Sequence, residues 1–321
     1  MTSAATSERV GATAGPAPTA STAGSRARSG SRRGRTLGLR TGHLFVLPYV
    51  ILLALFGIVP VIYSVYLAFT DAGGKFAGLS NFTRTARDYR FADSVKHVAL
   101  YVVIWLVALT VLVVLLALVV HRLSSGRTKA FIRFAYYIPG ALAGASSVLL
   151  WLFLLDPTVS PVSMILRWTG NDHFAEVVTP NHLPVVFAII AFWTGAGGWI
   201  LVLYGALNTI SADVLEAAKV DGAGPLRTAF NIQLPMIRKW ITYMLILSLA
   251  AGTQLFVEPE LVSQASFGIV PNDYSVNQLA YQFAFTQNDF NGSAAISIDL
   301  LIVALLCAGL FVARGRLFET D

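Results

Sequence analysis

Long apolar runs are the feature of this sequence that most constrains its fold. The hydrocarbon core of a bilayer is about 30 Å thick, so about 20 helical residues cross it. The backbone of a lipid-exposed segment must satisfy its own hydrogen bonds, which a helix does. Six runs reach the required length, and together they predict an all-α polytopic membrane protein with six transmembrane helices: 44–69, 95–120, 131–155, 183–207, 236–262 and 284–313.

The composition agrees with membrane insertion. Hydrophobic residues make up 55% of the chain and charged residues only 12%, with a mean hydropathy of +0.66. An ordinary water-soluble domain has about twice that share of charged residues. The first run is too long and too far from the N-terminus for a signal peptide. The last run has a polar start, so we expect its membrane part to begin near Ala294.

Residues 1–42 form a segment of a different kind. They are rich in Ala, Ser, Thr, Gly and Arg, and Glu8 is their one acidic residue. Such a segment cannot bury enough apolar surface to offset the entropy lost on ordering. We therefore expect a disordered basic cytoplasmic tail over 1–42 and the helical membrane domain over 43–321. The alternative is an organelle transit peptide, which has a similar Arg-rich, acid-poor composition.

The basic residues are distributed unevenly between the two predicted sides of the membrane. Seventeen of the 23 Lys and Arg residues lie in the tail, after the second run, after the fourth run and at the C-terminus. Positively charged loops stay in the cytoplasm, so both termini and the loop after the fourth run are predicted to lie there. Membrane topology thus accounts for the net charge of +6 and makes a nucleic-acid partner unnecessary.

The loop 211–237, after the fourth run, has internal order that a passive connector does not need. Ser211 is a favourable helix N-cap, and Asp213 and Glu216 place negative charge in the first turns, where the helix dipole favours it. Gly222 stands where a left-handed cap ends a helix. These residues predict a short helix that ends near Asp221.

A second short helix is predicted after the first. Pro225 is well suited to the first helical position, where its missing N–H does no harm. Leu226, Phe230 and Leu234 then recur at helical spacing. Pro235 leads the chain into the fifth apolar run.

The spacing of small and apolar residues in this loop resembles a known motif. The pattern resembles the EAA loop of permease subunits in bacterial binding-protein-dependent ABC importers: Glu216, Ala217 and Ala218, three residues, Gly222, nine residues, Ile232, one residue, then Leu234 and Pro235. The stretches FIRFAYYIPGALAGASSVLLWLFLLDP and GLSNF are also similar to six-helix carbohydrate permeases of the maltose and glycerol-phosphate type. One position departs from those relatives, which place an aromatic residue where Ala229 stands.

The resemblance implies a mechanical role for the loop. In the family, the loop inserts into a cleft of an ATPase subunit, with the glutamate as charged contact and the glycine allowing the turn. Carried over, the ATPase-coupling residues are Glu216, Ala217, Ala218, Asp221, Gly222, Ala223, Leu234 and Pro235. The alternative is an amphipathic interfacial loop that has no partner.

The resemblance also implies partners and a location. They are a second, non-identical permease, an ATP-binding subunit dimer, an extracellular solute-binding protein and the bilayer of the bacterial inner membrane. Gly73, Gly74 and Lys75 lack the other residues of a phosphate-binding loop. We therefore expect no cofactor on this chain, with ATP and Mg²⁺ used by the partner ATPase.

Polar and small residues inside the fourth and fifth runs mark a candidate substrate pathway, because polar groups in a membrane are costly and tend to face cavities. The resemblance places Thr194, Gly195, Gly198, Ser248, Gly252 and Leu255 where maltose-type permeases contact sugar, and those relatives have amide side chains where Gly252 and Leu255 stand. Gln254 and Glu258 add the amide and carboxylate groups typical of sugar sites. The alternative is helix packing, since glycines let helices approach closely. The predicted pathway is therefore Thr194, Gly195, Gly198, Ser248, Gly252, Gln254 and Glu258.

No catalytic or metal-binding set is present in the sequence. The five histidines lack ligand spacing, and Cys307 is the one cysteine. We expect a permease rather than an enzyme, with a membrane enzyme of lipid or glycan transfer as a distant alternative. An ion-driven secondary transporter is the nearer alternative, but it needs paired intramembrane acids, and only Asp299 and Glu258 are present. The substrate stays open among disaccharide, oligosaccharide, polyol and glycerol-phosphate ester.

Overall fold

The computed structural model describes residues 34–142 and 144–315. Within them the regular structure is helical, apart from one isolated bridge between Thr70 and Phe76. The all-α fold class is therefore confirmed. The chain divides after Phe56 into two units, which are described separately.

The first unit contains the helix α1 (Gly34–Leu53) and the start of a π-helical turn, η1 (Ala54–Ile58). Because α1 begins at Gly34, residues 34–42 are helical, although the sequence suggested that they belong to the tail. The rest of the predicted tail, 1–33, lies outside the described residues. The apolar helical stretch Leu44–Ala68 is long enough to cross a membrane.

The second unit holds the remaining long helices. Four helical stretches in it are long and apolar enough to span a membrane: Tyr89–Arg122, Leu183–Leu207, Pro225–Gly252 and Phe290–Ala313. The first of these joins α4 (Tyr89–Ala108), η2 (Leu109–Val113) and α5 (Val114–Arg122), and the last lies in α16 (Phe290–Gly315). The second is α10, and the third ends with α13 (Leu234–Gly252).

The predicted third span is divided in two. Helices α6 (Gly126–Ala141) and α7 (Ala145–Leu154) have the required length only together, and they meet at an angle of 103°. The described residues thus contain five candidate spans, or six if the bent pair counts as one. The six transmembrane helices that the sequence predicts are therefore found only if α6 and α7 are counted together as one span.

Two other predicted boundaries differ from the structure. The run 236–262 is interrupted, because α13 ends at Gly252 and α14 (Val257–Ala265) begins after a turn. The Asn277 side chain donates to the Thr253 carbonyl at 3.1 Å and so gives this backbone group at the break a hydrogen-bond partner. The last long helix begins at Phe290, where Asp289 accepts a hydrogen bond from the Gly292 N–H at 2.9 Å and caps its first turn. Where its membrane part begins, predicted near Ala294, stays a prediction.

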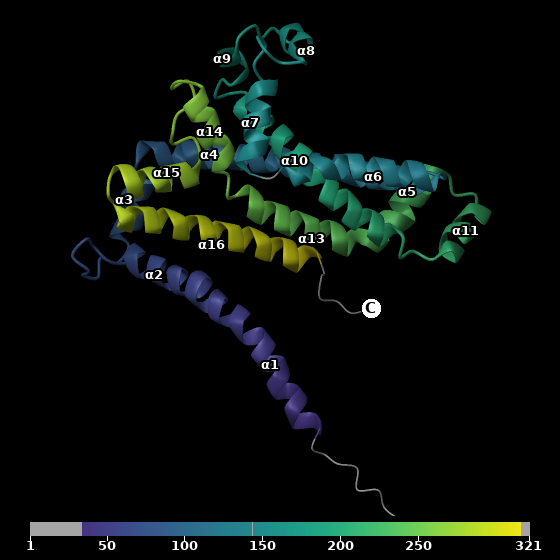
Figure 1. The fold of residues 1–321 in the computed structure, drawn as a ribbon, viewed down its shortest axis with the longest axis horizontal. Helices are drawn as coiled ribbons and strands as arrows, with labels where there is room; N and C mark the ends of the chain where they lie inside the picture. Colours follow the sequence, from purple (N-terminus) through teal and green to yellow (C-terminus); the bar gives the residue numbers. More distant parts are fainter. Residues whose placement is uncertain (1–33, 143, 316–321) are drawn as a thin grey trace, which may run out of the picture. The chain divides into compact units, whose positions relative to one another are not determined.

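Short helices lie at the ends of the long ones (Figure 1). Figure 1 shows α3 (Ser80–Ala86) and α15 (Val276–Tyr281) at one end, called here the α3 end, and α11 (Ala212–Val220) at the other, the α11 end. The remaining short elements of the second unit are α2 (Val59–Ala68), α8 (Ser163–Trp168), α9 (Phe174–Val177), α12 (Pro225–Thr228), η3 (Ala229–Gln233) and η4 (Gln282–Thr286).

Helix α10 lies at the centre of the second unit, packed against α4, α5, α6 and α13. Phe187, Ile200 and Leu203 on it are fully buried. A helix that is apolar on all sides is typical of such a central position. At Gly197 an added Cβ would overlap the backbone of Tyr136 on α6, so only glycine permits this approach.

Two asparagines close the C-terminus of α2 at the α3 end. Asn81 donates to the carbonyls of Ala68 and Thr70 at 3.0 and 2.8 Å, and Asn291 donates to those of Leu67 and Thr70 at 3.0 and 2.8 Å. The last carbonyls of a helix have no partner inside it. Side chains from α3 and α16 therefore supply the missing donors and join three helices.

An ion pair between Arg84 of α3 and Asp289 adds to this junction. Partial burial alone would raise the pKa of the Asp289 carboxyl, but hydrogen bonds from Arg84 and the Gly292 N–H, with the Arg84 charge, hold it below its usual value. A carboxyl whose pKa is lowered by folding stabilises the protein above its unfolded-state pKa, and the effect is lost as the pH falls through the lower value.

We expect Asp289→Asn to lower the melting temperature of the purified protein at pH 7 by the equivalent of about 0.5 kcal/mol, because the Arg84 side chain is half exposed. The amide oxygen still caps α16, so only the charge is lost. The difference from wild type should shrink as the pH falls below about 4 and vanish below the lowered folded-state pKa, where the carboxyl is protonated in both states. Adding Arg84→Gln to the Asp289→Asn variant should cause no further loss of stability. Additive losses from the two substitutions would contradict the pairing.

Candidate coupling loop and translocation pathway

Helix α11 is the first element of the loop that the sequence singled out. It begins after Ser211, whose backbone is extended as an N-cap requires, although its side chain makes no capping hydrogen bond. Asp213 lies in the first turn and Lys219 in the last, so both charges oppose the helix dipole. The predicted end near Asp221 is confirmed, because Asp221 is the C-cap.

The turn after α11 is a Schellman motif. The Ala223 N–H donates to the Ala218 carbonyl at 2.9 Å, and the Gly222 N–H donates to the Lys219 carbonyl at 3.1 Å. Gly222 has φ of +73°, a conformation that costs other residues about 1 kcal/mol or more. The glycine is thus required by the reversal itself.

The predicted coupling residues of α11 face in different directions. Glu216 and Ala217 are exposed, as are Asp221 and Gly222, whereas Ala218 is 5% exposed and packs inside the chain. The small size of Ala218 therefore has a reason within this chain. Glu216, Ala217, Asp221 and Gly222 are therefore the coupling residues of α11 and its turn that are open to another surface.

The predicted second short helix is not separate. Helix α12 runs through the π-helical η3 directly into α13, so residues 225–252 form one continuous helical stretch. Pro225 begins it, as the sequence predicts. Pro235 has no N–H to donate to the preceding turn, and the wide turn η3 lies directly before it. Irregular turns of this kind are common next to prolines in helices.

Ala229, where the relatives have an aromatic residue, is the first residue of η3. Ala229 is 4% exposed, and Phe230 is 65% exposed. The small residue therefore faces the protein and the aromatic residue faces out. Leu234, at the end of the motif, is half-buried, and Pro235 is exposed.

The glycines of the predicted pathway fall into two groups. An added Cβ at Gly252 would lie 2.7 Å from the ring of Trp105, so this glycine serves helix packing. Gly195 and Gly198 have no neighbour within 4 Å of such a Cβ and border open space. Thr194 donates its hydroxyl to the Ile190 carbonyl of its own helix at 3.0 Å.

Ser248 lies one turn before Gly252 on α13 and is buried as well. Its side chain is 2% exposed, and its hydroxyl oxygen has no hydrogen-bond partner among the described residues. The indole nitrogen of Trp105 is buried and unpaired as well. Tyr101 stacks on Trp105 at 5.8 Å and lies within electrostatic range of Glu258, which is half-buried.

A second group of unpaired polar atoms lies on α7, which packs against both α10 and α14. Ser147 and Trp151 are one turn apart, and each has a buried donor without a partner. Trp151 meets Trp193, the neighbour of Thr194, edge to face at 5.8 Å. Gln254, by contrast, is exposed in the turn between α13 and α14.

The sequence reasoning missed four residues of these groups: Tyr101, Trp105, Ser147 and Trp151. The aromatic pair in YVVIW was a possible signal, because aromatic rings four residues apart share a helix face. Over the described part of the chain, no cluster of three or more His, Cys, Asp or Glu side chains could hold a metal ion. What the two groups offer is hydroxyl and indole donors beside aromatic faces, a combination typical of small-molecule sites.

Comparison with known proteins decides the family. Residues 85–317 match the family described as binding-protein-dependent transport system inner membrane component. The chain belongs to this family. It is therefore a multi-pass inner-membrane permease subunit of an ABC importer and not an enzyme, and ATP hydrolysis belongs to a separate subunit.

Several transport permeases are similar along most of the chain. The probable starch degradation products transport system permease protein AmyD of Thermoanaerobacterium thermosulfurigenes is 28% identical over 271 residues, 82% of this chain and 90% of the relative. The diacetylchitobiose uptake system permease protein NgcF of Streptomyces coelicolor is 28% identical over 333 residues, 94% and 91% of the two chains. The sn-glycerol-3-phosphate permease protein UgpA of Escherichia coli is 28% identical over 272 residues, 82% and 90%.

The fold is shared with a solved transporter. A chain of a bacterial ABC transporter involved in the import of the acidic polysaccharide alginate superposes with a TM-score of 0.77 at 20% identity, covering 90% of this chain and all of that one. A chain of a bacterial alginate ABC transporter in complex with an alginate pentasaccharide-bound periplasmic protein gives a TM-score of 0.75 at 21% identity. The identification suggested by the EAA-like spacing is thus confirmed at the level of the family.

We expect Gly222→Ala to destabilise the turn after α11 by about 1 kcal/mol, because alanine is strained at a positive φ. Gly224→Ala is the matched control, since Gly224 has a φ of −67° and open space around it. Hydrogen exchange of the amides at 217–223, measured on the full-length protein, should accelerate several-fold only in the first variant. Equal exchange in both variants would contradict the assigned turn.

Proposed function

We propose that this permease carries a neutral oligosaccharide across the membrane and that α11 with its Schellman turn is the element held by the ATPase. The observation that carries the second part is the exposure of Glu216 and Ala217 on α11, whereas the adjacent Ala218 is buried. In the described ranges Glu216 makes no ion pair. An unpaired carboxylate next to a methyl group allows a basic partner surface to approach closely.

The position of α11 suits a coupler. It lies at one end of the long helices, and α12 continues directly into a stretch that ends at Gly252, beside Trp105 (Figure 1). A force applied at α11 therefore reaches the candidate pathway through one continuous helix. Closure of an ATPase dimer would thereby open the pathway alternately to each side.

The charge distribution supports a cytoplasmic α11 end and cytoplasmic termini. Arg122, Lys129, Arg133 and Lys219 are all near it, and Lys129 and Arg133 lie over the ring of Tyr204 at 6.0 and 4.8 Å. Basic residues next to spans remain inside the cell. The α3 end then faces outward, where a solute-binding protein would dock.

The substrate class follows from the chemistry of the candidate pathway. In the spans that the structure describes, the middle parts of α10, α13 and α16 contain no Lys or Arg, so a phosphate-bearing substrate finds no counter-charge there. Buried hydroxyl and indole donors next to aromatic rings match a neutral sugar. The starch-product and diacetylchitobiose permeases among the relatives agree with this class.

The complete importer would contain further components. A second, similar permease would complete the pathway, and an ATP-binding subunit dimer would use ATP and Mg²⁺. An extracellular binding protein would deliver the sugar, as the solved alginate complex includes a periplasmic protein. This chain itself would need no cofactor.

A single-cysteine variant tests the coupler. With Cys307→Ala as background, a cysteine at Ala217 should crosslink to a nucleotide-hydrolysing subunit in intact membranes. A cysteine at Phe267, which is 98% exposed and on the segment after α14, is the control that should not capture it. Glu216→Lys should leave insertion intact and reduce uptake at least tenfold, because the charge is reversed at the contact.

Absence of ATPase capture at position 217, together with normal uptake by Glu216→Lys, would refute the coupler. Uptake of the sugar must be assayed in cells that contain the complete importer. Membrane abundance of each variant has to be matched to that of wild type.

Replacement of Ser248 tests the sugar pathway. We expect Ser248→Ala to weaken transport of a neutral oligosaccharide about five-fold, because one hydrogen bond to the substrate contributes about 1 kcal/mol. Ser297→Ala is the control, since the Ser297 hydroxyl donates to its own helix at 3.0 Å. The concentration dependence of uptake measures this effect. If half-maximal uptake occurs at the same sugar concentration in both variants, Ser248 does not belong to the pathway.

A further inference from the structure

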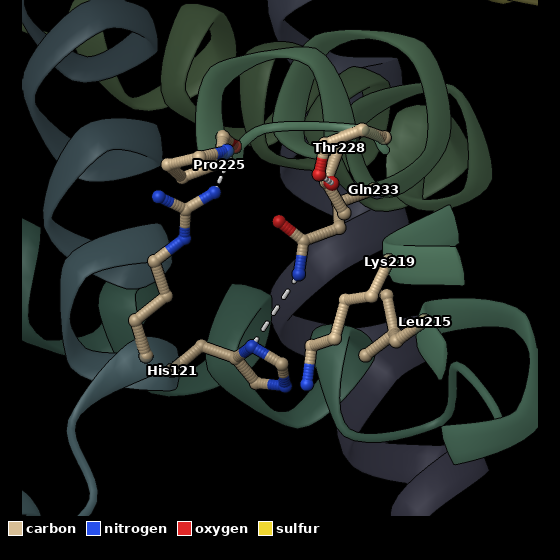
Figure 2. Close-up of a pocket in the computed structure, with 8 residues that line it drawn as sticks. His121, Leu215, Lys219, Pro225, Thr228 and Gln233 are labelled. Carbon is tan, nitrogen blue, oxygen red and sulfur yellow. Dashed lines mark hydrogen bonds between the residues drawn. The ribbon is translucent and has the colours of Figure 1, made fainter. Parts of the chain in front are cut away.

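A cavity of about 460 Å³ lies behind α11, between that helix, the end of α5 and the start of the long helix that contains α13. Figure 2 shows that side chains from three separate segments surround one open space. A volume in the low hundreds of Å³ is typical of sites for small organic molecules. The lining residues are His121, Arg122, Leu215, Lys219, Ala223, Pro225, Thr228 and Gln233.

The charged side chains of this cavity all have the same sign. Arg122 and Lys219 are both basic, no lining residue is acidic, and none of the ion pairs found among the described residues includes either of them. Arg122 donates one N–H to the Pro225 carbonyl, which fixes its guanidinium at the cavity and leaves further donors available. Lys219 extends along the opposite wall (Figure 2). Two cations that face one space favour an anion between them.

Gln233 supplies an independent indication of a ligand. Its side chain is 3% exposed, and its amide nitrogen is 3.5 Å from His121 Nδ1, which leaves the oxygen as the free atom. That oxygen is buried without a hydrogen-bond partner and points into the cavity (Figure 2). A buried acceptor left unpaired costs about 1–3 kcal/mol. A ligand that offers a hydroxyl group would remove this cost.

We propose that this cavity binds a phosphate group that carries neighbouring hydroxyls. Arg122 and Lys219 hold the phosphate, Gln233 accepts a hydrogen bond from a hydroxyl, and Leu215 and Pro225 cover the carbon skeleton. Two sources offer this chemistry: the headgroup of phosphatidylglycerol, since basic pockets at the cytoplasmic side bind anionic lipid headgroups, or a soluble glycerol phosphate.

The site joins α5 to α11 and therefore has a regulatory consequence. A bound phosphate would hold Lys219 of α11 against Arg122 of α5 and stiffen the element that receives the ATPase. This consequence rests on the proposed coupling function, whereas binding itself does not.

Binding is tested on the full-length permease in nanodiscs of phosphatidylcholine, with phosphatidylglycerol added to the bilayer in one arm and glycerol 3-phosphate added to the solution in the other. The readouts are the melting temperature and native mass spectrometry. We expect Arg122→Gln and Lys219→Gln each to weaken binding about tenfold, and Gln233→Leu to weaken it several-fold. Arg127→Gln is the matched control, because Arg127 is a neighbouring exposed cation that does not line the cavity.

Each outcome has a meaning. Saturable binding in only one arm, lost in the two cation variants, supports the site and identifies the source of the phosphate. Absence of binding in both arms, or an equal loss in Arg127→Gln, overturns the site. If binding is lost in Lys219→Gln but sugar uptake keeps the same dependence on phosphatidylglycerol or glycerol 3-phosphate, the regulatory consequence is wrong, although the site stands.

Discussion

The close packing of α10 against the helices around it is the interaction on which the second unit depends. Lipid tails are as apolar as the side chains of a membrane helix, so burial alone does not bring such helices together. Gly197 solves this problem by letting the backbone of Tyr136 approach where any side chain would overlap it. The Gly140 position is similar, with an added Cβ at 3.1 Å from the Thr194 carbonyl. Backbone proximity, rather than bulk hydrophobicity, therefore fixes α6 on α10.

This packing also positions the chemistry. Thr194 of α10 supplies the carbonyl at the Gly140 contact, and Trp193 beside it meets Trp151 of α7. At a further helix contact, Gly252 lets α13 approach Trp105 of α4. Both groups of unpaired polar atoms, that of Trp105 and Ser248 and that of Ser147 and Trp151, thus lie near a helix contact at which a glycine has no side chain. Small residues and candidate ligand contacts occur together because a tight helix crossing leaves neighbouring hydroxyl and indole groups without water.

Local signals in the sequence were sufficient for the class of fold and for the turn after α11. The capping glycine at 222 and the proline at 225 act within a few residues, so their effects can be inferred without tertiary structure. The break in the third run was missed because small and apolar residues continue across it, and the break in the fifth run was missed because Leu255, Phe256 and Val257 extend the apolar run beyond Gly252. Asn277 satisfies a carbonyl at the fifth-run break from a distant segment. Trp105 and Ser147 were missed because an unpaired donor is a property of its surroundings.

The π-helical turn η3 has a consequence for how the permease family can change. A π turn holds one more residue than an α turn, and one residue corresponds to about 100° of rotation around the helix axis. Losing or gaining a single residue between Ala229 and Gln233 would turn everything before it, α11 included, around the axis of α13. A one-residue insertion or deletion in this short segment would therefore change the direction in which the proposed ATPase-facing surface points, without altering a residue of the membrane interior.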